Sequence, residues 1–285
     1  MRRNRRSWGL FGIIFILLAT TLAARAQTPS PTATPSLEHQ FFKNILRDQK
    51  AIWTSPLHLQ RSDAKWMVPA GMGLMALITT DRITGDEIFE FDRQVKTSRA
   101  ISHAGSVYTL GAVAGSFYLI GRHRNDDRAR ETGLLSAEAL VDSLITGGAL
   151  KEITQRARPL AGGERSEFFD GGVSFPSGHS TQAWAVATII ANEYRHRRAV
   201  QIAAYGVASA VSVARFTVHK HYLSDVLVGS ALGYGIGRYV YHAHHQTSLD
   251  SSVDDGPLSQ SWRPRFTPQF SPRAHAYGVA LTWNF

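Results

Sequence analysis

The sequence predicts an all-α protein, a helical bundle followed by a short irregular tail with one possible β-strand. Apolar, Ala-rich runs separated by polar stretches such as "GRHRNDDRARE" fill most of residues 38–245, and long strand-like alternation is missing there. Apolar residues make up 44% of the 285-residue chain and charged residues 19%, which is enough for a sizeable core. The chain has no cysteine, so its stability must come from packing rather than disulfides.

The helical pattern divides into separate runs, with no internal repeat. We expect helices near residues 39–53, 66–80, 100–121, 132–157, 180–196, 199–214 and 222–242.

The lengths of these runs favour a soluble bundle over a multi-span membrane protein. A spanning helix needs about 20 apolar residues, and only residues 100–121 reach this length without a charged side chain. The run 132–150 carries Glu138 and Asp142, and the mean hydropathy of the chain is −0.15. We therefore expect buried helices of a soluble or membrane-peripheral protein, with membrane embedding as the alternative.

The N-terminus has the pattern of an export signal. Residues 1–26 combine a basic start, an apolar run and an A-x-A-like end, which predicts a secretory signal peptide, with a retained anchor as the alternative. Residues 27–37 are rich in Pro, Ser and Thr and predict a flexible linker. Removing the five arginines of the signal lowers the net charge from +9 to +4, which argues against nucleic acid binding. We expect a periplasmic protein or, alternatively, an inner-membrane protein whose active site faces the periplasm.

Residues 246–285 form a polar tail that differs from the helical domain over 38–245. Most of the tail contains proline and polar residues and is expected to be irregular. The last stretch alternates apolar and smaller residues from Tyr277 to Phe285, which predicts a strand. We expect an edge strand or a tail packed on the bundle.

The first segment with candidate binding residues is "KEITQRARP". Lys151 and Arg158 are seven residues apart, which places both cations on one face of a helix before Pro159 ends it. Two cations on one face can hold an anion such as phosphate. A basic, solvated helix face explains the same pattern.

The second segment is "PSGHS" at residues 176–180. Gly178 allows close backbone approach, and Ser177 or Ser180 can cap the helix that follows. The N–H groups at a helix start bind anions, and His179 adds a titratable donor there. Taken alone, a histidine in this position is explained equally by an exposed or hydrogen-bonded side chain without a catalytic role.

The third segment is "ARFTVHKHYLSDVLVG". Arg215 ends one apolar run, and His221 and Asp225 are four residues apart at the start of the next. A carboxylate bonded to one imidazole nitrogen fixes the tautomer and frees the other nitrogen to act as nucleophile or base. An ordinary surface pair explains the spacing equally well, and His219, two positions before His221, is expected to be a bystander.

Together the three segments resemble the signature of the type 2 phosphatidic acid phosphatase superfamily, which includes class A acid phosphatases, lipid phosphate phosphatases and vanadium haloperoxidases. The family pattern is Lys-x6-Arg-Pro, then Pro-Ser-Gly-His, then Ser-Arg-x5-His-x3-Asp. The matching residues are Lys151, Arg158, Pro159, Pro176, Ser177, Gly178, His179, Arg215, His221 and Asp225. Ala214 stands where the family usually has serine, which puts one hydrogen bond to the neighbouring arginine in doubt.

The resemblance implies a helical bundle of the acid phosphatase and haloperoxidase type and a phosphatase mechanism. His221 would attack phosphorus and form a phosphohistidine, with Asp225 orienting it. His179, charged while His221 is neutral, would protonate the leaving oxygen, which suits an acidic pH optimum. The phosphoryl oxygens would be held by Lys151, Arg158 and Arg215 with the backbone N–H groups near Ser177 and Gly178.

No metal or other cofactor is expected in this site, because three protein cations take the role that magnesium has in many phosphoryl-transfer enzymes. The histidine tract His242, His244 and His245 is expected to be an exposed polar tail with at most adventitious metal binding.

Three hypotheses about the function of the protein remain open at this point. The first is a phosphatase for phosphomonoesters, lipid phosphates or diphosphates, and the pattern does not choose among these substrates or set the oligomeric state. The second is a vanadate-dependent haloperoxidase, which the compact chain disfavours. The third is a non-catalytic envelope protein that binds anionic lipid, which the His221–Asp225 pair and His179 disfavour because binding needs no nucleophile.

Overall fold

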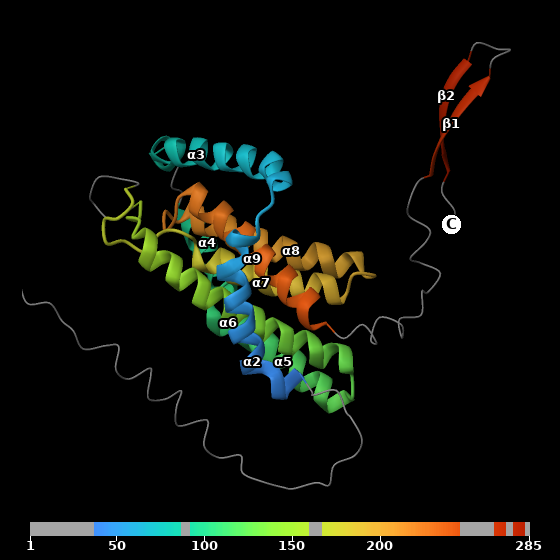
Figure 1. The fold of residues 1–285 in the computed structure, drawn as a ribbon, viewed down its shortest axis with the longest axis horizontal. Helices are drawn as coiled ribbons and strands as arrows, with labels where there is room; N and C mark the ends of the chain where they lie inside the picture. The colour runs from blue at the N-terminus through green and yellow to red at the C-terminus, as the bar shows by residue number, and fades with distance from the viewer. Residues whose placement is uncertain (1–36, 87–91, 160–166, 246–264, 272–275, 283–285) are drawn as a thin grey trace, which may run out of the picture. The chain divides into compact units, whose positions relative to one another are not determined.

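The helical architecture expected from the sequence is confirmed by a computed structural model, which describes residues 37–86, 92–159, 167–245, 265–271 and 276–282. The helices are α2 (Leu37–Thr54), α3 (Ala64–Asp86), α4 (Asp92–Ala104), α5 (Val107–Arg124), α6 (Asp127–Thr154), α7 (Gly178–Glu193), α8 (Arg198–Thr217) and α9 (Leu223–His244) (Figure 1). Two 3-10 turns, η1 (Ser55–His58) and η2 (Arg61–Asp63), connect α2 to α3. The predicted signal peptide, and the linker up to residue 36, lie outside the described residues.

The run expected over 100–121 is not one helix. It is divided between α4 and α5, and α4 begins at Asp92, well before the apolar run. The break has a local cause, because the Ser106 side chain accepts a hydrogen bond from the Thr109 N–H and so caps the start of α5. Gly105 fits against α8 at the same corner, where a Cβ would lie 2.4 Å from Val211 Cγ1.

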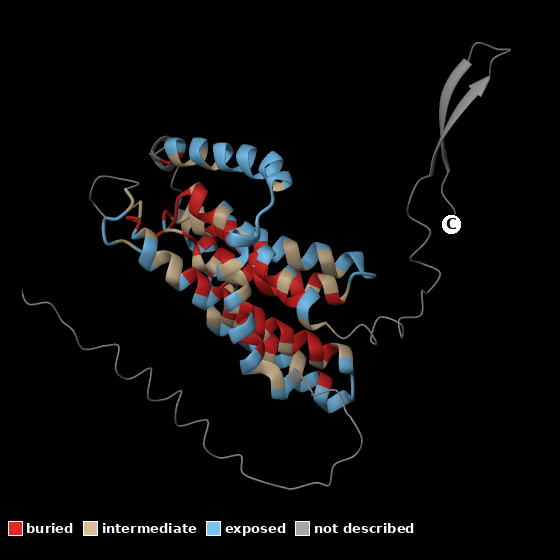
Figure 2. Ribbon diagram, in the orientation of Figure 1, coloured by how far each residue is buried: buried red, intermediate tan, exposed pale blue. Residues whose placement is uncertain are grey.

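Helix α7 lies at the centre of the bundle and packs against α5, α6, α8 and α9. One apolar cluster joins α7 to α8 through residues such as Val186 and Val211, and a second joins it to α6 and α9 through Ile189 and Val240. Figure 2 shows α7 as largely buried. The first turn of α7, which carries His179, is thus fixed by packing on several sides.

Helix α9 approaches α7 closely along a stripe of glycines spaced four residues apart. A Cβ at Gly229 would lie 2.7 Å from the Ser177 carbonyl oxygen, and one at Gly233 would lie 2.1 Å from the Thr181 carbonyl oxygen. Gly237 repeats the contact one turn later. Small residues allow two helix backbones to meet in this way, so the stripe sets the distance between the starts of α7 and α9.

The tail contains a two-stranded antiparallel sheet of β1 (Arg265–Ser271) and β2 (Ala276–Thr282), in which Arg265 pairs with Thr282. Strand β2 confirms the strand predicted at the chain end as far as residue 282. The expectation of irregular structure was wrong for β1. The physical reason is that a strand needs a partner for its N–H and C=O groups, and β1 supplies one for β2.

Several helices turn apolar side chains outward. Helices α6 and α8 are long and apolar enough to cross a membrane, and α4 and α5, bent by 43° at their junction, pass the same test as a pair. Only 22% of the most apolar window of α8 is buried, and Ile202, Val207 and Val213 of this helix are exposed. These outward faces do not fit the buried helices expected of a soluble bundle, and they favour the membrane alternative.

Candidate active site

The three sequence motifs meet where α6 ends and where α7 and α9 begin. The Lys151 Nζ, in the last turn of α6, donates to the carbonyl oxygens of Pro176 at 2.5 Å and Val173 at 2.8 Å. The Ser177 N–H donates to the Asp225 carbonyl oxygen at 3.0 Å. The motifs are therefore joined through their backbones as well as their side chains.

Lys151 and Arg158 do not lie on one helix face as the spacing predicted. Helix α6 ends at Thr154, and Gln155 takes a left-handed conformation with φ of 45°, its N–H donating to the Lys151 carbonyl oxygen. Arg158 therefore lies beyond the helix, in the segment that follows it. Its Nε is buried and has no hydrogen-bond partner among the described residues, which suits a group that receives an anion.

His221 is held by the backbone of the segment before α7. Its Nδ1 lies 2.8 Å from the Ser174 carbonyl oxygen. A carbonyl oxygen only accepts hydrogen bonds, so Nδ1 carries the proton and Nε2 keeps its lone pair. His221 is buried, and this contact fixes its tautomer and ring orientation.

Asp225 supports His221 from a greater distance than expected. The Asp225 Oδ2 lies 3.6 Å from Nδ1 of His221, which is beyond normal hydrogen-bond length. The same oxygen accepts from the Ser174 hydroxyl at 2.5 Å and from the Tyr222 N–H at 2.9 Å. Asp225 thus holds the residue whose carbonyl oxygen orients His221, and it places a negative charge beside the imidazole.

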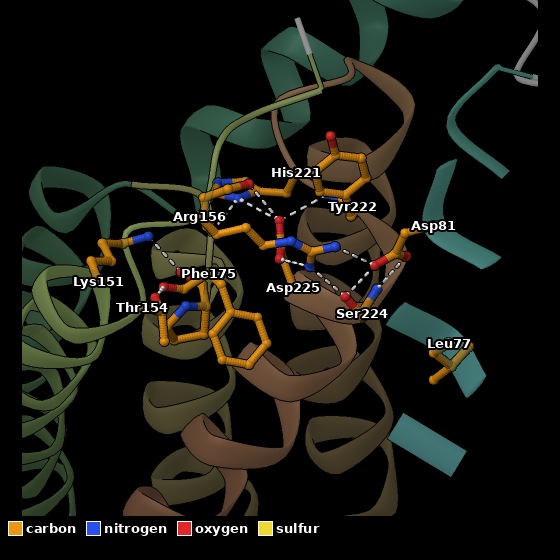
Figure 3. Close-up of polar contacts among 12 residues, drawn as sticks. Leu77, Asp81, Lys151, Thr154, Arg156, Phe175, His221, Tyr222, Ser224 and Asp225 are labelled. Carbon is orange, nitrogen blue, oxygen red and sulfur yellow. Dashed lines mark hydrogen bonds and ion pairs between the residues drawn. The ribbon is translucent and has the colours of Figure 1, made fainter. Parts of the chain in front are cut away.

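A buried arginine anchors this carboxylate. The Arg156 Nη1 donates to Asp225 Oδ1 at 2.6 Å, and its Nη2 donates to Asp81 Oδ2 of α3 at 2.7 Å (Figure 3). The Arg156 Nη1 also donates to the Ser224 hydroxyl at 2.7 Å. The guanidinium carbon lies 4.3 Å from the ring centre of Tyr222, and Arg156 is fully buried. One cation is therefore shared by two buried carboxylates from different helices.

The three sequence motifs do not single out Arg156, Asp81, Ser174 and Ser224. Arg156 lies inside "KEITQRARP", two residues before Arg158, and the sequence does not distinguish it from the other cations of this basic segment. Asp81 lies 75 residues from Arg156, in a stretch whose sequence predicts a polar connection between two helices. A signal for Ser174 is its place just before the "PSGH" motif, although nothing in the sequence indicates that its carbonyl oxygen faces His221.

The start of α7 offers backbone donors, but not from Ser177. The Ser177 N–H is engaged by Asp225, whereas the N–H groups of Gly178 and His179 make no hydrogen bond with any described residue. A Cβ at Gly178 would meet Lys151 and Gln182 only at 3.7 Å, an ordinary contact. Packing within the protein therefore does not require glycine here, and the missing side chain leaves the backbone N–H groups open to close approach.

Arg215 receives its support from α4, whose last residues belong to the helical run expected over 100–121. Ala214 is buried and offers no side-chain acceptor, and Arg215 Nη1 donates instead to the Ser102 hydroxyl of α4 at 2.8 Å. The Nε of Arg215 is buried and has no hydrogen-bond partner among the described residues. Ser102 thus gives Arg215 the side-chain partner that Ala214 does not offer, and the Nε donor remains for an anion.

Both histidines are neutral in the free protein at neutral pH. Burial lowers the pKa of His221 to about 4, partly offset by Asp225. Burial, followed by the positive charge of Arg215, lowers the pKa of His179 to about 4. The expected charged form of His179 therefore needs a bound anion, whose negative charge would raise this pKa.

The histidine tract after residue 241 is not an exposed tail as expected. His242 is exposed, but the side chains of His244 and His245 are only 5% and 8% exposed and lie against buried carboxylates. The Tyr241 ring stacks on His245 at 4.4 Å between ring centres. These contacts continue the bundle to the end of α9.

Comparisons with known proteins find similar proteins for the segment that carries the three motifs. Residues 132–248 match the family model described as the PAP2 superfamily. A lipid A 1-phosphatase of Porphyromonas gingivalis is 41% identical over 69 residues, which are 24% of this chain and 16% of the relative. A PA-phosphatase-related protein of Dictyostelium discoideum is 27% identical over 143 residues, 44% of this chain and 52% of the relative. The matched parts thus span at most about half of these relatives.

Two solved structures are similar at low identity. A transmembrane PAP2-type phosphatidylglycerolphosphate phosphatase from Bacillus subtilis gives a TM-score of 0.46 at 21% identity, covering 75% of this chain and 96% of the other. The LpxE protein of Aquifex aeolicus gives 0.45 at 16% identity, covering 59% and 95%. The resemblance indicated by the three motifs is confirmed by the family match: the segment that carries them, residues 132–248, matches the model of the PAP2 superfamily.

Proposed function

We propose that this protein is a phosphatase that hydrolyses phosphate esters through a phosphohistidine at His221. The observation that carries the proposal is the hydrogen bond from Nδ1 of His221 to the Ser174 carbonyl oxygen, at 2.8 Å. This bond keeps the lone pair on Nε2, where attack on phosphorus requires it. The new bond joins Nε2 to phosphorus while the bond from phosphorus to the leaving oxygen breaks.

His179 is the proposed acid and base. It belongs to the first turn of α7, and its imidazole makes no hydrogen bond with any described residue, so the ring is available to substrate. Once the substrate's charge has raised its pKa, it gives a proton to the leaving oxygen, then accepts one from the water that attacks the phosphohistidine. The two steps together consume one water and restore both histidines.

The phosphoryl oxygens are proposed to lie among Lys151, Arg158 and Arg215. Buried Nε atoms of both arginines lack partners among the described residues, and the N–H groups of Gly178 and His179 add two neutral donors. These donors stabilise the charge on the equatorial oxygens in the transition state. The Lys151 Nζ also bonds two backbone carbonyl oxygens, so it shapes the start of α7 as well as supplying charge.

We further propose that the enzyme is embedded in a membrane and acts on a lipid phosphate. Lipid tails would cover the outward apolar face of α8, which the protein itself leaves exposed. The predicted export signal supports an active site on the periplasmic side of the inner membrane. The curated relatives, one of them a lipid A 1-phosphatase, support a lipid substrate.

The test uses the full chain in detergent micelles. Release of inorganic phosphate is measured from a lipid phosphate, a lipid diphosphate and a soluble phosphomonoester, with His221→Ala beside the wild type and His123→Ala as a control at an exposed position. We expect turnover with the lipid phosphate that falls at least about 10³-fold in His221→Ala and stays unchanged in the control. Bromide oxidation with vanadate and peroxide, or binding without turnover, would contradict the proposal.

Membrane embedding has its own test. Washing membranes with high salt and alkaline carbonate should leave the protein in the pellet, and detergent should release it. Release by salt alone would contradict embedding and would indicate peripheral association.

A further inference from the structure

A second polar cluster is buried far from the active site. It comprises Asp48 of α2, Glu138 of α6 and His244 at the end of α9. The His244 Nε2 lies 2.9 Å from both carboxylate oxygens of Asp48, and one ligand atom from each of the three residues lies within 4.8 Å of the others. His244 follows Asp225 by 19 residues of helix, a rise of about 28 Å.

The cluster holds more carboxyl groups than it has cationic partners among the described residues. Asp142, one helical turn after Glu138, brings a third carboxylate, and the side chains of Asp48, Glu138 and Asp142 are all fully buried. Among the described residues, none of the three forms an ion pair with lysine or arginine, and His244 is the one cationic partner, through Asp48. Burying several carboxylates with a single imidazole is costly unless a further positive charge is present.

Two oxygens of the cluster have no partner. Glu138 Oε1 accepts from the Asn44 side chain at 3.0 Å and Asp142 Oδ1 accepts from Gln49 at 2.9 Å. The second oxygen of each carboxylate, Glu138 Oε2 and Asp142 Oδ2, is buried without any hydrogen bond to the described residues. Such orphaned acceptors need an explanation, and a bound cation satisfies them directly.

We propose that Asp48, Glu138 and His244 form a binding site for a divalent transition-metal ion, with the Asp142 carboxylate beside it. One imidazole with two or three carboxylates is a donor set that Zn²⁺ and Mn²⁺ accept. The ligand atoms of Asp48, Glu138 and His244 already lie within 4.8 Å of one another. The ion takes no part in the phosphatase chemistry, because the active site lies at the other end of α9.

The site fastens α2 to the rest of the bundle. Asn44 and Gln49 of α2 bond the same carboxylates of α6 that the ion would bind, so the ligands and their hydrogen bonds form one network across three helices. Metal binding then stabilises the folded protein, since the unfolded chain does not hold the ligands together.

A neighbouring cluster of Glu131, Glu193 and His245 fits an ion less well. His245 Nδ1 contacts Glu131 at 3.0 Å and Glu193 at 3.3 Å, so the imidazole already bridges both carboxylates. The Arg128 guanidinium donates to the Glu193 carbonyl oxygen at 2.6 Å and brings positive charge nearby. Both Glu193 oxygens also lack a hydrogen bond among the described residues. We place the ion in the first cluster because His245 pairs with both carboxylates of its own cluster, whereas His244 pairs with Asp48 and leaves Glu138 without a cationic partner among the described residues.

The experiment measures metal content of the full chain in detergent. The protein is stripped with a chelator, incubated with Zn²⁺, passed through a desalting column and analysed by mass spectrometry for metal per chain. We expect about one Zn²⁺ in the wild type, at least about tenfold weaker binding in Glu138→Gln and His244→Gln, and no change in His242→Gln, the exposed histidine of the same tract. His245→Gln should also leave binding unchanged.

The wild type alone keeps the proposal falsifiable if a variant fails to fold. Its midpoint of thermal unfolding should rise with Zn²⁺, and Co²⁺ should give the visible absorption of a four- or five-coordinate site. Absence of stoichiometric metal in the wild type at pH 7 would overturn the proposal. Full retention in both Glu138→Gln and His244→Gln, or loss in His245→Gln alone, would also overturn it.

Discussion

Arg156 and Asp225 form an ion pair at 2.6 Å in which neither side chain reaches solvent. The second arm of the same guanidinium pairs with Asp81 of α3 at 2.7 Å. The Asp225 carboxylate beside the proposed nucleophile is therefore fixed, through Arg156, by Asp81, which lies 75 residues before Arg156 along the chain. This relationship makes α3 a structural part of the site, although α3 carries none of the three motifs.

The first prediction concerns this pair. Replacing Arg156 by methionine leaves Asp225 and Asp81 buried without their shared cation, which should lower the free energy of unfolding by about 3–5 kcal/mol. Arg156→Lys keeps the charge but loses the two donor groups that bind both carboxylates. Its free energy of unfolding should therefore lie between those of Arg156→Met and the wild type. Thermal unfolding in detergent measures both, with the exposed Arg238→Lys as the control. A wild-type midpoint in Arg156→Met would show that the pair does not stabilise the fold.

The second prediction compares two glycines of α9. A Cβ at Gly233 would lie 2.1 Å from a backbone oxygen of α7, whereas nothing lies within 4 Å of one at Gly235. Gly233→Ala should therefore destabilise the protein by about 1–3 kcal/mol through overpacking and should separate the starts of α7 and α9. Gly235→Ala should raise stability by up to about 1 kcal/mol, because alanine favours helix. Equal midpoints of unfolding would refute the close packing of the two helices.

The third prediction follows from the neutral state of His179. Its pKa is lowered to about 4 in the free protein, and an anion in the site should raise it. Binding of sulfate, which does not itself titrate near neutrality, should therefore take up close to one proton per site at pH 6. Calorimetry in buffers of different ionisation enthalpy measures this uptake. It should disappear in His179→Gln and persist in His123→Gln, and binding without uptake in the wild type would count against His179 as the acid.

The fourth prediction is the pH dependence of stability due to His221. The folded protein keeps this imidazole neutral above about pH 4, whereas histidine in an unfolded chain takes up a proton below about pH 6.5. The unfolded state thus binds more protons between these values, so the contribution is complete above pH 6.5 and is lost as the pH falls. The loss is on the order of 3 kcal/mol at pH 4. Midpoints of unfolding should fall less steeply with acid in His221→Gln, and parallel curves would argue against a buried neutral His221.

The residues that belong to contiguous motifs were readable from the sequence. Lys151, Gly178, His179, Arg215 and His221 lie in the three motifs, because their order and local spacing are properties of the chain itself. The helical class followed from the same local patterns, since apolar periodicity reports which face of a segment is buried.

The residues that depend on packing were not readable in the same way. Arg156 resembles any cation of a basic segment until its burial and its two carboxylates are known, and Asp81 has no local pattern that points to Arg156. The end of α6 at Thr154 depends on Gln155 taking a left-handed conformation, which glutamine adopts rarely. The burial of His244 depends on α2 lying against α6 and α9, a contact between segments almost 200 residues apart.

The most direct measurement is the identification of the phosphorylated residue. Full-length His179→Gln is mixed with a lipid phosphate, quenched in alkali and analysed by mass spectrometry, because loss of the base should slow breakdown of the intermediate. The mechanism predicts an acid-labile phosphoryl group on His221, absent when His221→Ala is added to the same variant. A phosphoryl group on another residue, or wild-type turnover in His221→Ala, would contradict it.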